Sequence, residues 1–300
     1  MKKTRRIGMV APSGRLPNEA EADRAARFFT RRGWQVLAGE SVFEHDTRFA
    51  GPDDLRASEL QSFATDPRID VVLSARGGYG ITRLLHRFDY RAIAERAPIL
   101  VGYSDFTAFN LAYLAQAGGV SFQGPSAVDF AREAPQSETV EQFFAAIENA
   151  EHEVSFATEA PPLTVRGTLW GGNLAMVNSL LGTPYFPHVK GGILFLEDVN
   201  EPAYKVERML LQLHQAGILE AQRAIVLGAF EPMAVMASDY GFEMTEVLAR
   251  LMAATATPII TGLPFGHVPK KAMLAVGADA RLSIKGGLAR LSFSGYPNLA

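Results

Sequence analysis

The sequence predicts an α/β protein with a doubly wound parallel sheet in its first part and a smaller, barrel-like α+β domain after it. Three observations lead to this prediction. Up to about residue 130, short apolar segments alternate with helical patterns, as in a parallel sheet covered on both faces. Those segments contain few polar positions. Beyond about residue 162, alternating hairpin-like segments mix with helices, which indicates a different architecture.

The first part is expected to contain five strands joined by helices. Asn18 resembles a helix N-cap, with Glu21 three positions later, and the first helix is expected to end at Gly33. The expected strands are 6–14, 34–39, 70–75, 97–103 and 119–124, and the further helices are 52–64, 81–88 and 107–116.

The second part mixes strands, helices and a hairpin. An acidic helix within 131–153 and the proline-containing stretch 158–163 separate it from the first part. Strands are expected at 191–199, 223–230 and 257–265, helices at 203–217 and 244–255, and a hairpin over 280–293 around Gly286–Gly287. We therefore divide the chain into a first domain (1–130), a helical linker (131–162) and a C-terminal domain (163–300).

Composition excludes several classes of protein. The 300 residues carry 29 Lys and Arg against 32 Asp and Glu, for a net charge of −3, and the only basic run is the opening KKTRR. A nucleic-acid binder usually carries a basic stripe, so no nucleic-acid partner is expected. Neither a signal peptide nor an apolar stretch of membrane-spanning length is recognisable, so we expect a cytoplasmic protein with no membrane partner.

The chain contains no cysteine, which removes disulfides, thiolate catalysis and thiolate metal ligands. A covalent nucleophile would have to be Ser, Thr, Asp, Glu, Lys or Tyr. There is no HExxH motif and no cluster of His and Asp at metal-ligand spacing, so no metal and no cofactor are expected.

The first candidate for chemistry is Ser104, in the stretch VGYSDFTAFN. It follows an expected strand and precedes an expected helix, and reacting groups in wound sheets gather at the carboxyl ends of strands. The turn resembles the nucleophile elbow G-x-S-x-G, except that Phe106 replaces the last glycine. Serine is also a favoured N-cap, and Asp105 suits the first turn of a helix. A helix cap and a nucleophile therefore both remain possible from the local pattern.

The second candidate is the glycine-rich stretch ARGGYGITRLL, also at the end of a strand. Gly77, Gly78 and Gly80 would let the backbone approach a ligand and offer N–H groups to an anion. Arg76 could pair with a carboxylate or a phosphate. The spacing is neither a Walker A loop nor G-x-G-x-x-G, so an unoccupied glycine turn is an equal alternative.

Two further segments carry acid and base side chains. Glu197 ends an apolar strand, as either a solvated terminus or a placed acid, whereas Glu201, Glu207 and Arg208 suit surface charges at a helix start. His267 lies in the loop LPFGHVPKK, where it is either a solvated histidine or a catalytic base carried by a rigid sheet.

Taken in order, RGGYG, the Ser104 turn, GTLWGGN, FLEDVNE and the His267 loop resemble the LD-carboxypeptidase family of serine peptidases. The resemblance extends from APSG to the region of His267. It implies a flavodoxin-like N-terminal domain, a barrel-like C-terminal domain and a homodimer. It also implies a triad of Ser104, Glu197 and His267, with Glu201 as the residue to test next if Glu197 proved dispensable.

The resemblance assigns further roles as well. The backbone N–H groups of Gly78 and Asp105 would form an oxyanion hole. The implied reaction is hydrolysis of the L,D peptide bond that releases terminal D-alanine from a murein tetrapeptide, in peptidoglycan recycling. Arg76 would be a candidate to hold the free carboxylate of this small peptide.

Two alternatives stay open. Some relatives of the family cleave peptide–nucleotide antibiotics of the microcin C kind and confer immunity, which would need a nucleotide pocket, for example one lined by Trp170. A non-catalytic module that binds a small ligand at RGGYG would explain the wound sheet, but it would leave Ser104, Glu197 and His267 unrelated.

Overall fold

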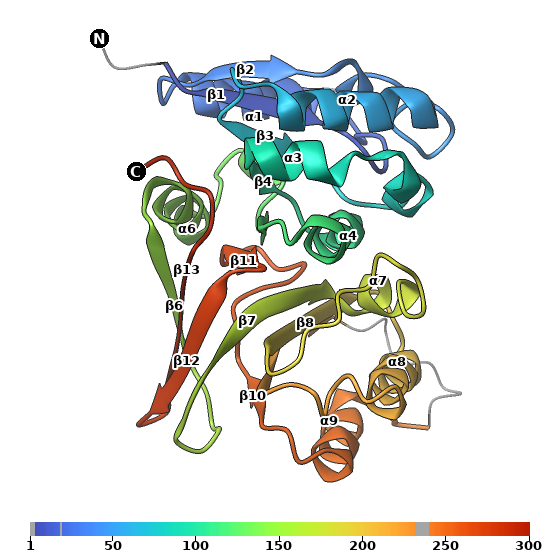
Figure 1. Cartoon of the computed structure of the whole chain (residues 1–300), viewed down its shortest axis with the longest axis vertical. Coiled ribbons are helices and arrows are strands. Elements are labelled where there is room, and N and C mark those ends of the chain that lie inside the picture. The colour runs from blue at the N-terminus through green and yellow to red at the C-terminus, as the bar shows by residue number, and fades with distance from the viewer. Residues whose placement is uncertain (1–3, 19, 232–239) are drawn as a thin grey trace.

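The computed structural model describes residues 4–18, 20–231 and 240–300, so Lys2 and Lys3 of the KKTRR run lie outside it. Its strands form two sheets, one above the other in Figure 1. The upper sheet has six strands in the order β11-β5-β4-β3-β1-β2, and the lower one has seven in the order β10-β9-β8-β7-β12-β13-β6.

The upper sheet confirms the wound fold predicted for the first part. Its strands are β1 (Arg6–Val10), β2 (Gln35–Ala38), β3 (Val71–Ser74), β4 (Ile99–Val101), β5 (Ser121–Gln123) and β11 (Leu274–Val276). Strands β1 to β5 pair in parallel in the flavodoxin-like order 2-1-3-4-5. Strand β11 was not predicted: it comes from the second part of the chain and pairs antiparallel with β5.

Helices cover this sheet, α1 packing against α5, and α3 against both α2 and α4 (Figure 1). The α-helices are α1 (Ala20–Thr30), α2 (Asp53–Thr65), α3 (Tyr90–Arg96), α4 (Thr107–Ala117), α5 (Ala127–Phe130) and α6 (Ser137–Glu148). The short 3₁₀ helices are η1 (Glu40–Val42), η2 (Ile81–Arg83), η3 (Leu85–Arg87) and η4 (Ser104–Phe106). Asn18 Oδ1 accepts the N–H of Ala20 at 2.9 Å, in agreement with the expected cap.

One predicted helix is wrong. The segment 81–88 forms the two 3₁₀ turns η2 and η3 instead of a single α-helix. Its first N–H, on Ile81, is held by the side chain of Asp105, and the following Asp89 begins a separate helix by accepting the N–H of Ala92. The segment therefore cannot continue as one regular helix.

The lower sheet is mixed. Its strands are β6 (Glu151–Ala157), β7 (Leu163–Asn173), β8 (Ile193–Val199), β9 (Ala224–Glu231), β10 (Ile259–Thr261), β12 (Asp279–Lys285) and β13 (Leu288–Ser294), and the helices beside it are α7 (Leu174–Ser179), α8 (Ala203–Gln215) and α9 (Met244–Ala254). Strands β7 to β10 pair in parallel, whereas β7, β12, β13 and β6 pair antiparallel. The predicted hairpin is β12–β13, and Gly286 and Gly287 both take positive φ, as a tight hairpin turn requires.

This sheet curls so that its two edge strands approach each other. Gly262, just after β10, lies so close to Ala157 of β6 that an added Cβ would meet the Ala157 carbonyl oxygen at 2.3 Å. The barrel-like form expected of the second domain follows from this curl.

The segment 131–162 is not only helical. It contains α6 and also β6, whose exposed and buried side chains alternate and which pairs with β13 of the lower sheet. The linker as predicted therefore supplies an edge strand of the second sheet, while β11 crosses back to the first. The two parts are therefore joined by the segment 131–162 and by one strand, β11, that the second part adds to the first sheet.

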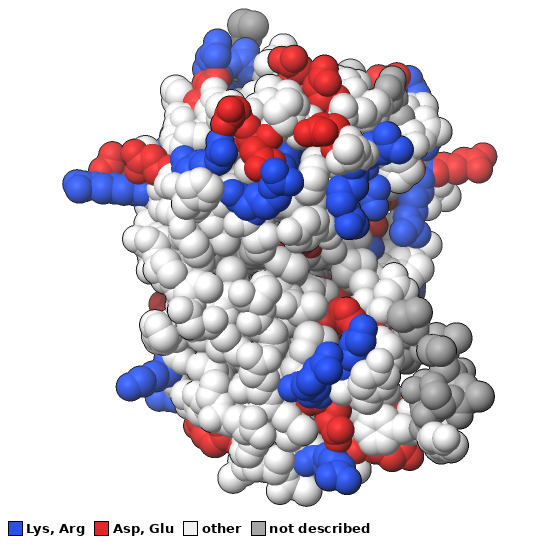
Figure 2. Space-filling view, turned by 90° about the vertical axis from the view of Figure 1, so that its right-hand side faces the viewer, with Lys and Arg blue, Asp and Glu red and all other residues white. Residues whose placement is uncertain are grey.

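Figure 2 shows charged side chains of both signs interspersed on the upper part of one face, above a mostly uncharged middle. No helix within the described ranges has the length and apolarity needed to cross a membrane.

Candidate active site

Ser104 lies on a strained turn between β4 and α4. Its φ is +63°, in the left-handed region that a non-glycine residue enters at a cost of about 1–2 kcal/mol. Tyr103 precedes η4 and Phe106 precedes α4, and neither helix start has a side-chain cap. The capping role considered for Ser104 is therefore not seen, and its hydroxyl instead faces the second part of the chain.

The Ser104 hydroxyl, the His267 imidazole and the Glu197 carboxylate form one row of hydrogen bonds. Ser104 Oγ lies 3.0 Å from His267 Nε2, and His267 Nδ1 lies 2.8 Å from Glu197 Oε2. The residues come from the turn after β4, from the end of β8 and from the loop after β10. The structure thus brings together three side chains separated by up to 163 positions.

Glu197 is completely buried at the end of β8. Its Oε2 faces His267, and its Oε1 has no hydrogen-bond partner among the described residues. Gly266 takes φ +139°, and a Cβ there would lie 3.2 Å from Glu197 Oε2. A buried carboxylate with one free oxygen interacts strongly with any positive charge that forms on the neighbouring imidazole.

The neighbouring acidic residues have other partners. Glu201 pairs with Lys205 at 3.7 Å and Glu207 with Arg250 at 3.4 Å, both at partly exposed sites, as expected for surface charges. Asp198 caps α7 by accepting the N–H of Ala175 at 2.9 Å, and burial raises the pKa of Asp198 to about 6. Of the acidic residues of FLEDVNE, it is therefore Glu197 that contacts His267, while the others have different partners.

The glycine-rich loop lies against Ser104. A Cβ added to Gly77 would lie 2.6 Å from Ser104 Cβ and 2.8 Å from its Oγ, closer than real Cβ contacts come. The Asp105 side chain joins the loop to the serine turn by accepting the N–H of Ile81 at 2.9 Å, and burial raises the pKa of that carboxyl. The loop and the serine turn are therefore one packed unit.

Gly77→Ala is expected to lower kcat/KM by about 10²-fold, because the new methyl group would displace the Ser104 hydroxyl. Gly118→Ala is the matched control. Gly118 ends α4 at φ +61° with open space around its Cβ position, so this change costs stability but leaves the site intact. Peptide hydrolysis and thermal unfolding of both variants would check this, and an active Gly77→Ala enzyme would contradict the contact.

Two backbone N–H groups near Ser104 are free to bind an anion. Among the hydrogen bonds of the described residues, neither the Gly78 nor the Asp105 N–H has an acceptor. Asp105 N would lie 3.4 Å from a Cβ on Gly77, which puts the two loops in contact. Their predicted role as an oxyanion hole stays a prediction.

The loop that carries His267 is fastened to the first part of the chain. Lys271 Nζ lies 2.8 Å from Asp129 Oδ1 and 2.7 Å from the Val268 carbonyl oxygen, and both charged side chains are buried. The Lys271 N–H donates to Thr139 Oγ1 at 2.8 Å. Sequence reasoning missed this pair, since the second lysine of PKK has no local feature that separates it from a surface lysine.

Lys271→Met is expected to lower the free energy of unfolding by about 3 kcal/mol, because it removes the buried partner of Asp129 and leaves only the partly exposed Arg132, at 3.7 Å, beside that carboxylate. It should also lower kcat by loosening the His267 loop. Lys270→Met is the control, since Lys270 pairs with Glu138 at an exposed site and its loss should leave stability unchanged. Urea unfolding of both variants tests this, and equal losses would rule out a special role for Lys271.

The structure places the two residues predicted to contact the substrate, Arg76 and Trp170, in different surroundings. Arg76 follows β3 and its Nη1 donates to the Arg15 carbonyl oxygen at 2.8 Å, beside a surface cavity. Trp170 is completely buried in β7, its Nε1 donating to Gln222 Oε1 at 3.0 Å and its ring packing on Phe186. The structure therefore places Trp170 in the core, where its side chain has no surface exposed to a ligand.

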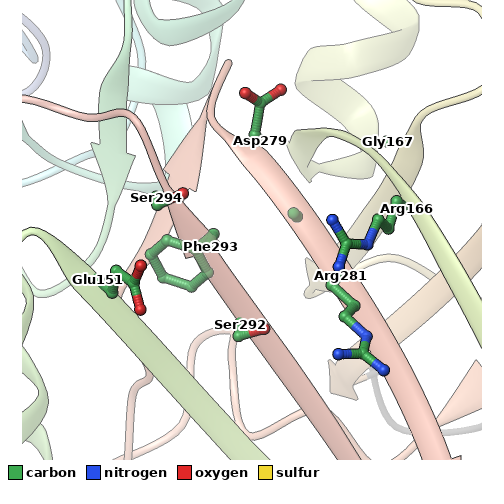
Figure 3. Close-up of a pocket in the computed structure, with 9 residues that line it drawn as sticks. Glu151, Arg166, Gly167, Asp279, Arg281, Ser292, Phe293 and Ser294 are labelled. Atoms are coloured by element: carbon green, nitrogen blue, oxygen red, sulfur yellow. The ribbon is translucent and has the colours of Figure 1, made fainter.

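A second cavity lies on the lower sheet and is drawn in Figure 3. It measures about 530 Å³ and lies over β6, β7, β12 and β13, where Arg166 and Arg281 project together from neighbouring strands. None of the three hydrogen-bonded residues of the serine site lines it. Within the described ranges, no group of three or more His, Asp or Glu side chains could hold a metal ion.

Two known domain families match most of the chain. The LD-carboxypeptidase N-terminal domain model matches residues 7–124 and the C-terminal domain model matches residues 166–282. A putative carboxypeptidase of Streptomyces coelicolor is 34% identical over 291 residues, covering 94% of this chain and 91% of that protein.

Two solved structures are also similar. The crystal structure of muramoyltetrapeptide carboxypeptidase from Oxalobacter formigenes has a TM-score of 0.91 and 40% identity, covering 98% of this chain and 100% of that one. Microcin C7 self-immunity protein MccF with aspartyl sulfamoyl adenosine has a TM-score of 0.86 at 22% identity, covering 100% and 98%, which shows a shared fold alone. The matches of both domain models, together with the Streptomyces coelicolor relative that is 34% identical over 94% of this chain, show that the chain belongs to the LD-carboxypeptidase family.

Proposed function

We propose that this protein is a serine carboxypeptidase that hydrolyses the L,D peptide bond of a murein tetrapeptide and releases terminal D-alanine. The observation that carries the proposal is the row Ser104–His267–Glu197, with separations of 3.0 and 2.8 Å. Membership of the LD-carboxypeptidase family and the similarity to a muramoyltetrapeptide carboxypeptidase support the choice of substrate.

The first half of the reaction forms an acyl-enzyme. A serine hydroxyl is a weak nucleophile at neutral pH, so His267 Nε2 takes the proton of Ser104 as Oγ attacks the scissile carbonyl carbon. The carbonyl electrons move to its oxygen, and His267 then gives the proton to the departing amine of D-alanine. The bond between carbonyl carbon and nitrogen breaks, leaving the shortened peptide as an ester on Ser104.

The second half returns the enzyme to its starting state. Water loses a proton to His267 as its oxygen attacks the ester carbonyl, and the Ser104 oxygen leaves with that proton. Glu197 holds the imidazole with its N–H at Nδ1 and stabilises the imidazolium in both halves. Its complete burial strengthens this interaction because water does not screen it.

In both halves an oxyanion forms on the carbonyl oxygen. We propose that the N–H groups of Gly78 and Asp105 bind it, since both lie on loops in contact at Ser104 and lack other acceptors among the described residues. Loss of one such donor typically raises the barrier by about 3–4 kcal/mol.

A second candidate is hydrolysis of peptide–nucleotide antibiotics, as the similarity to MccF suggests. That similarity is one of fold, and Trp170, the aromatic side chain expected to line a nucleotide pocket, is buried in the core. The murein peptide is therefore the better supported substrate.

A panel of defined compounds tests the proposal. Purified protein should release D-alanine from a murein tetrapeptide with an L,D bond and leave the matching D,D-linked peptide uncut. Turnover of an aminoacyl sulfamoyl adenylate alone would move the assignment to the immunity type. No turnover of any compound by folded protein would favour the non-catalytic binding module.

The family resemblance also leads us to propose a homodimer acting in the cytoplasm. Sedimentation equilibrium of the purified chain would check the first point by giving the mass of one or two copies of a 32.5 kDa chain.

A further inference from the structure

A basic cavity lies beside the serine site, on the upper sheet. It measures about 400 Å³ and is lined by Gly14, Arg15, Thr47, Arg48, Arg76, Gly78 and Tyr79. Gly14 and Arg15 follow β1, and Arg76, Gly78 and Tyr79 follow β3. Strands β1 and β3 are parallel neighbours, and the order 2-1-3-4-5 places successive strands on one side of β1 and then on the other. Ligands of wound sheets bind in the crevice at the point where the strand order reverses in this way.

The cavity is built from three loops that are hydrogen-bonded to one another. The Gly14 N–H donates to the Gly77 carbonyl oxygen and the Arg15 N–H to the Arg48 carbonyl oxygen, both at 3.1 Å. Arg76 Nη1 donates to the Arg15 carbonyl oxygen at 2.8 Å, and the Arg48 guanidinium lies 5.4 Å from the centre of the Tyr79 ring. These contacts place Arg15, Arg48 and Arg76 around one cavity.

The three arginine side chains that line this cavity have no ion-pair partner among the described residues. No carboxylate of the described residues lies within 4 Å of the guanidinium nitrogens of Arg15, Arg48 or Arg76, and no acidic residue lines the cavity. The arginines just beyond it differ, since Arg83 pairs with Asp53 and Arg87 with Asp54. Uncompensated guanidinium groups in a concave site bind carboxylates, often through two N–H donors at once.

The cavity adjoins the nucleophile. Gly78 forms part of its wall, and the preceding Gly77 is in contact with Ser104. A peptide bond held over Ser104 therefore has its next residue within reach of the cavity, because one residue spans about 3.3–3.6 Å. In a carboxypeptidase substrate that next residue is the last, and it ends in a free carboxylate.

We propose that Arg15, Arg48 and Arg76 bind the terminal carboxylate of the leaving residue. The inference rests on the proposed function, because it takes the scissile carbonyl to face Ser104. It adds Arg15 and Arg48 to the expected Arg76, and it explains how the site selects the last peptide bond: an internal bond would place an uncharged amide against three guanidinium groups.

Binding in the Ser104→Ala background tests the inference without requiring turnover. By calorimetry, this variant should bind the murein tetrapeptide at least about tenfold more tightly than the same peptide ending in a carboxamide. Adding Arg76→Gln or Arg48→Gln should reduce the difference by weakening only the acid, since two of the three arginines remain. Arg91→Gln is the control, because Arg91 lies on the exposed face of α3 and pairs with Glu95, and it should leave the difference unchanged.

Three results would overturn the inference. The acid and the carboxamide could bind equally, the arginine variants could weaken both peptides alike, or the tetrapeptide could fail to bind. The diamino acid of the peptide carries a second carboxylate, on its side chain, and a third peptide amidated only there shows which carboxylate the arginines bind. If the arginine variants act through the side-chain carboxylate alone, the assignment to the terminal carboxylate is wrong. Hydrolysis of the tetrapeptide by the wild type, measured separately, reports on the proposed function whatever these binding results are.

Discussion

Ser104→Ala is expected to abolish release of D-alanine from a murein tetrapeptide, with kcat lower by about 10⁶-fold. The change removes the oxygen that lies 3.0 Å from His267 Nε2 and leaves the base without a nucleophile to activate. Because alanine is one atom smaller, the fold should be kept. Chromatography of the released amino acid measures the rate, and thermal unfolding shows that the variant is folded.

Ser58→Ala is the matched control for this change. Ser58 lies on the exposed side of α2, and its hydroxyl donates only to the Leu55 carbonyl oxygen at 3.2 Å. Its removal should leave kcat unchanged. Hydrolysis by folded Ser104→Ala at the rate of the Ser58→Ala enzyme would show that another group attacks the peptide.

Glu197→Gln is expected to lower kcat by about 10⁴-fold, although the side chain keeps its size. The carboxylate accepts the N–H at His267 Nδ1, so that Nε2 is free to take the Ser104 proton. A glutamine can present its NH₂ group to Nδ1 instead and so favour the opposite tautomer, whose Nε2–H cannot accept a proton. It also lacks the charge that stabilises the imidazolium.

Glu201→Gln distinguishes the two glutamates of FLEDVNE. Glu201 is partly exposed and pairs with Lys205 at 3.7 Å, so its loss should leave kcat within about twofold of the wild type. Steady-state kinetics on both variants gives the comparison. A large loss in Glu201→Gln with little change in Glu197→Gln would reverse the assignment of the acid.

The wound sheet and the three hydrogen-bonded residues could be predicted from the sequence. The alternation of apolar strands with helices is a strong local signal, and it places Ser104 at the end of β4. The local pattern could not separate a helix cap from a nucleophile, because a positive φ of +63° at a serine has no signature in the residues around it. The order of motifs along the whole chain supplied that distinction.

Features that depend on distant pairing could not be predicted in this way. Strand β11 has only three residues and joins a sheet whose other strands end more than 150 residues earlier. Strand β6 carried a readable alternation in EHEVSFA, but we assigned the region to an acidic helix and linker. The Lys271–Asp129 pair joins residues 142 positions apart, and only the fold reveals that both side chains are buried.

The cavity lined by Arg15, Arg48 and Arg76 could not be predicted from the sequence either. Each arginine lies in a separate loop, and each is ordinary in its own sequence context. They meet because β1 and β3 are neighbours in the sheet and because the loops that follow them are hydrogen-bonded to each other and to the loop that holds Arg48. Arg76 alone could be singled out, since it adjoins the glycine-rich stretch.

A crystal structure of the Ser104→Ala protein with a murein tetrapeptide bound tests the central claim most directly. Our account predicts that the carbonyl carbon of the last peptide bond lies over the Cβ of position 104, within reach of His267. Its oxygen should face the N–H groups of Gly78 and Asp105, and its terminal carboxylate should face the arginine cavity. A tetrapeptide bound away from position 104, or bound there with an internal peptide bond at His267, would contradict the account.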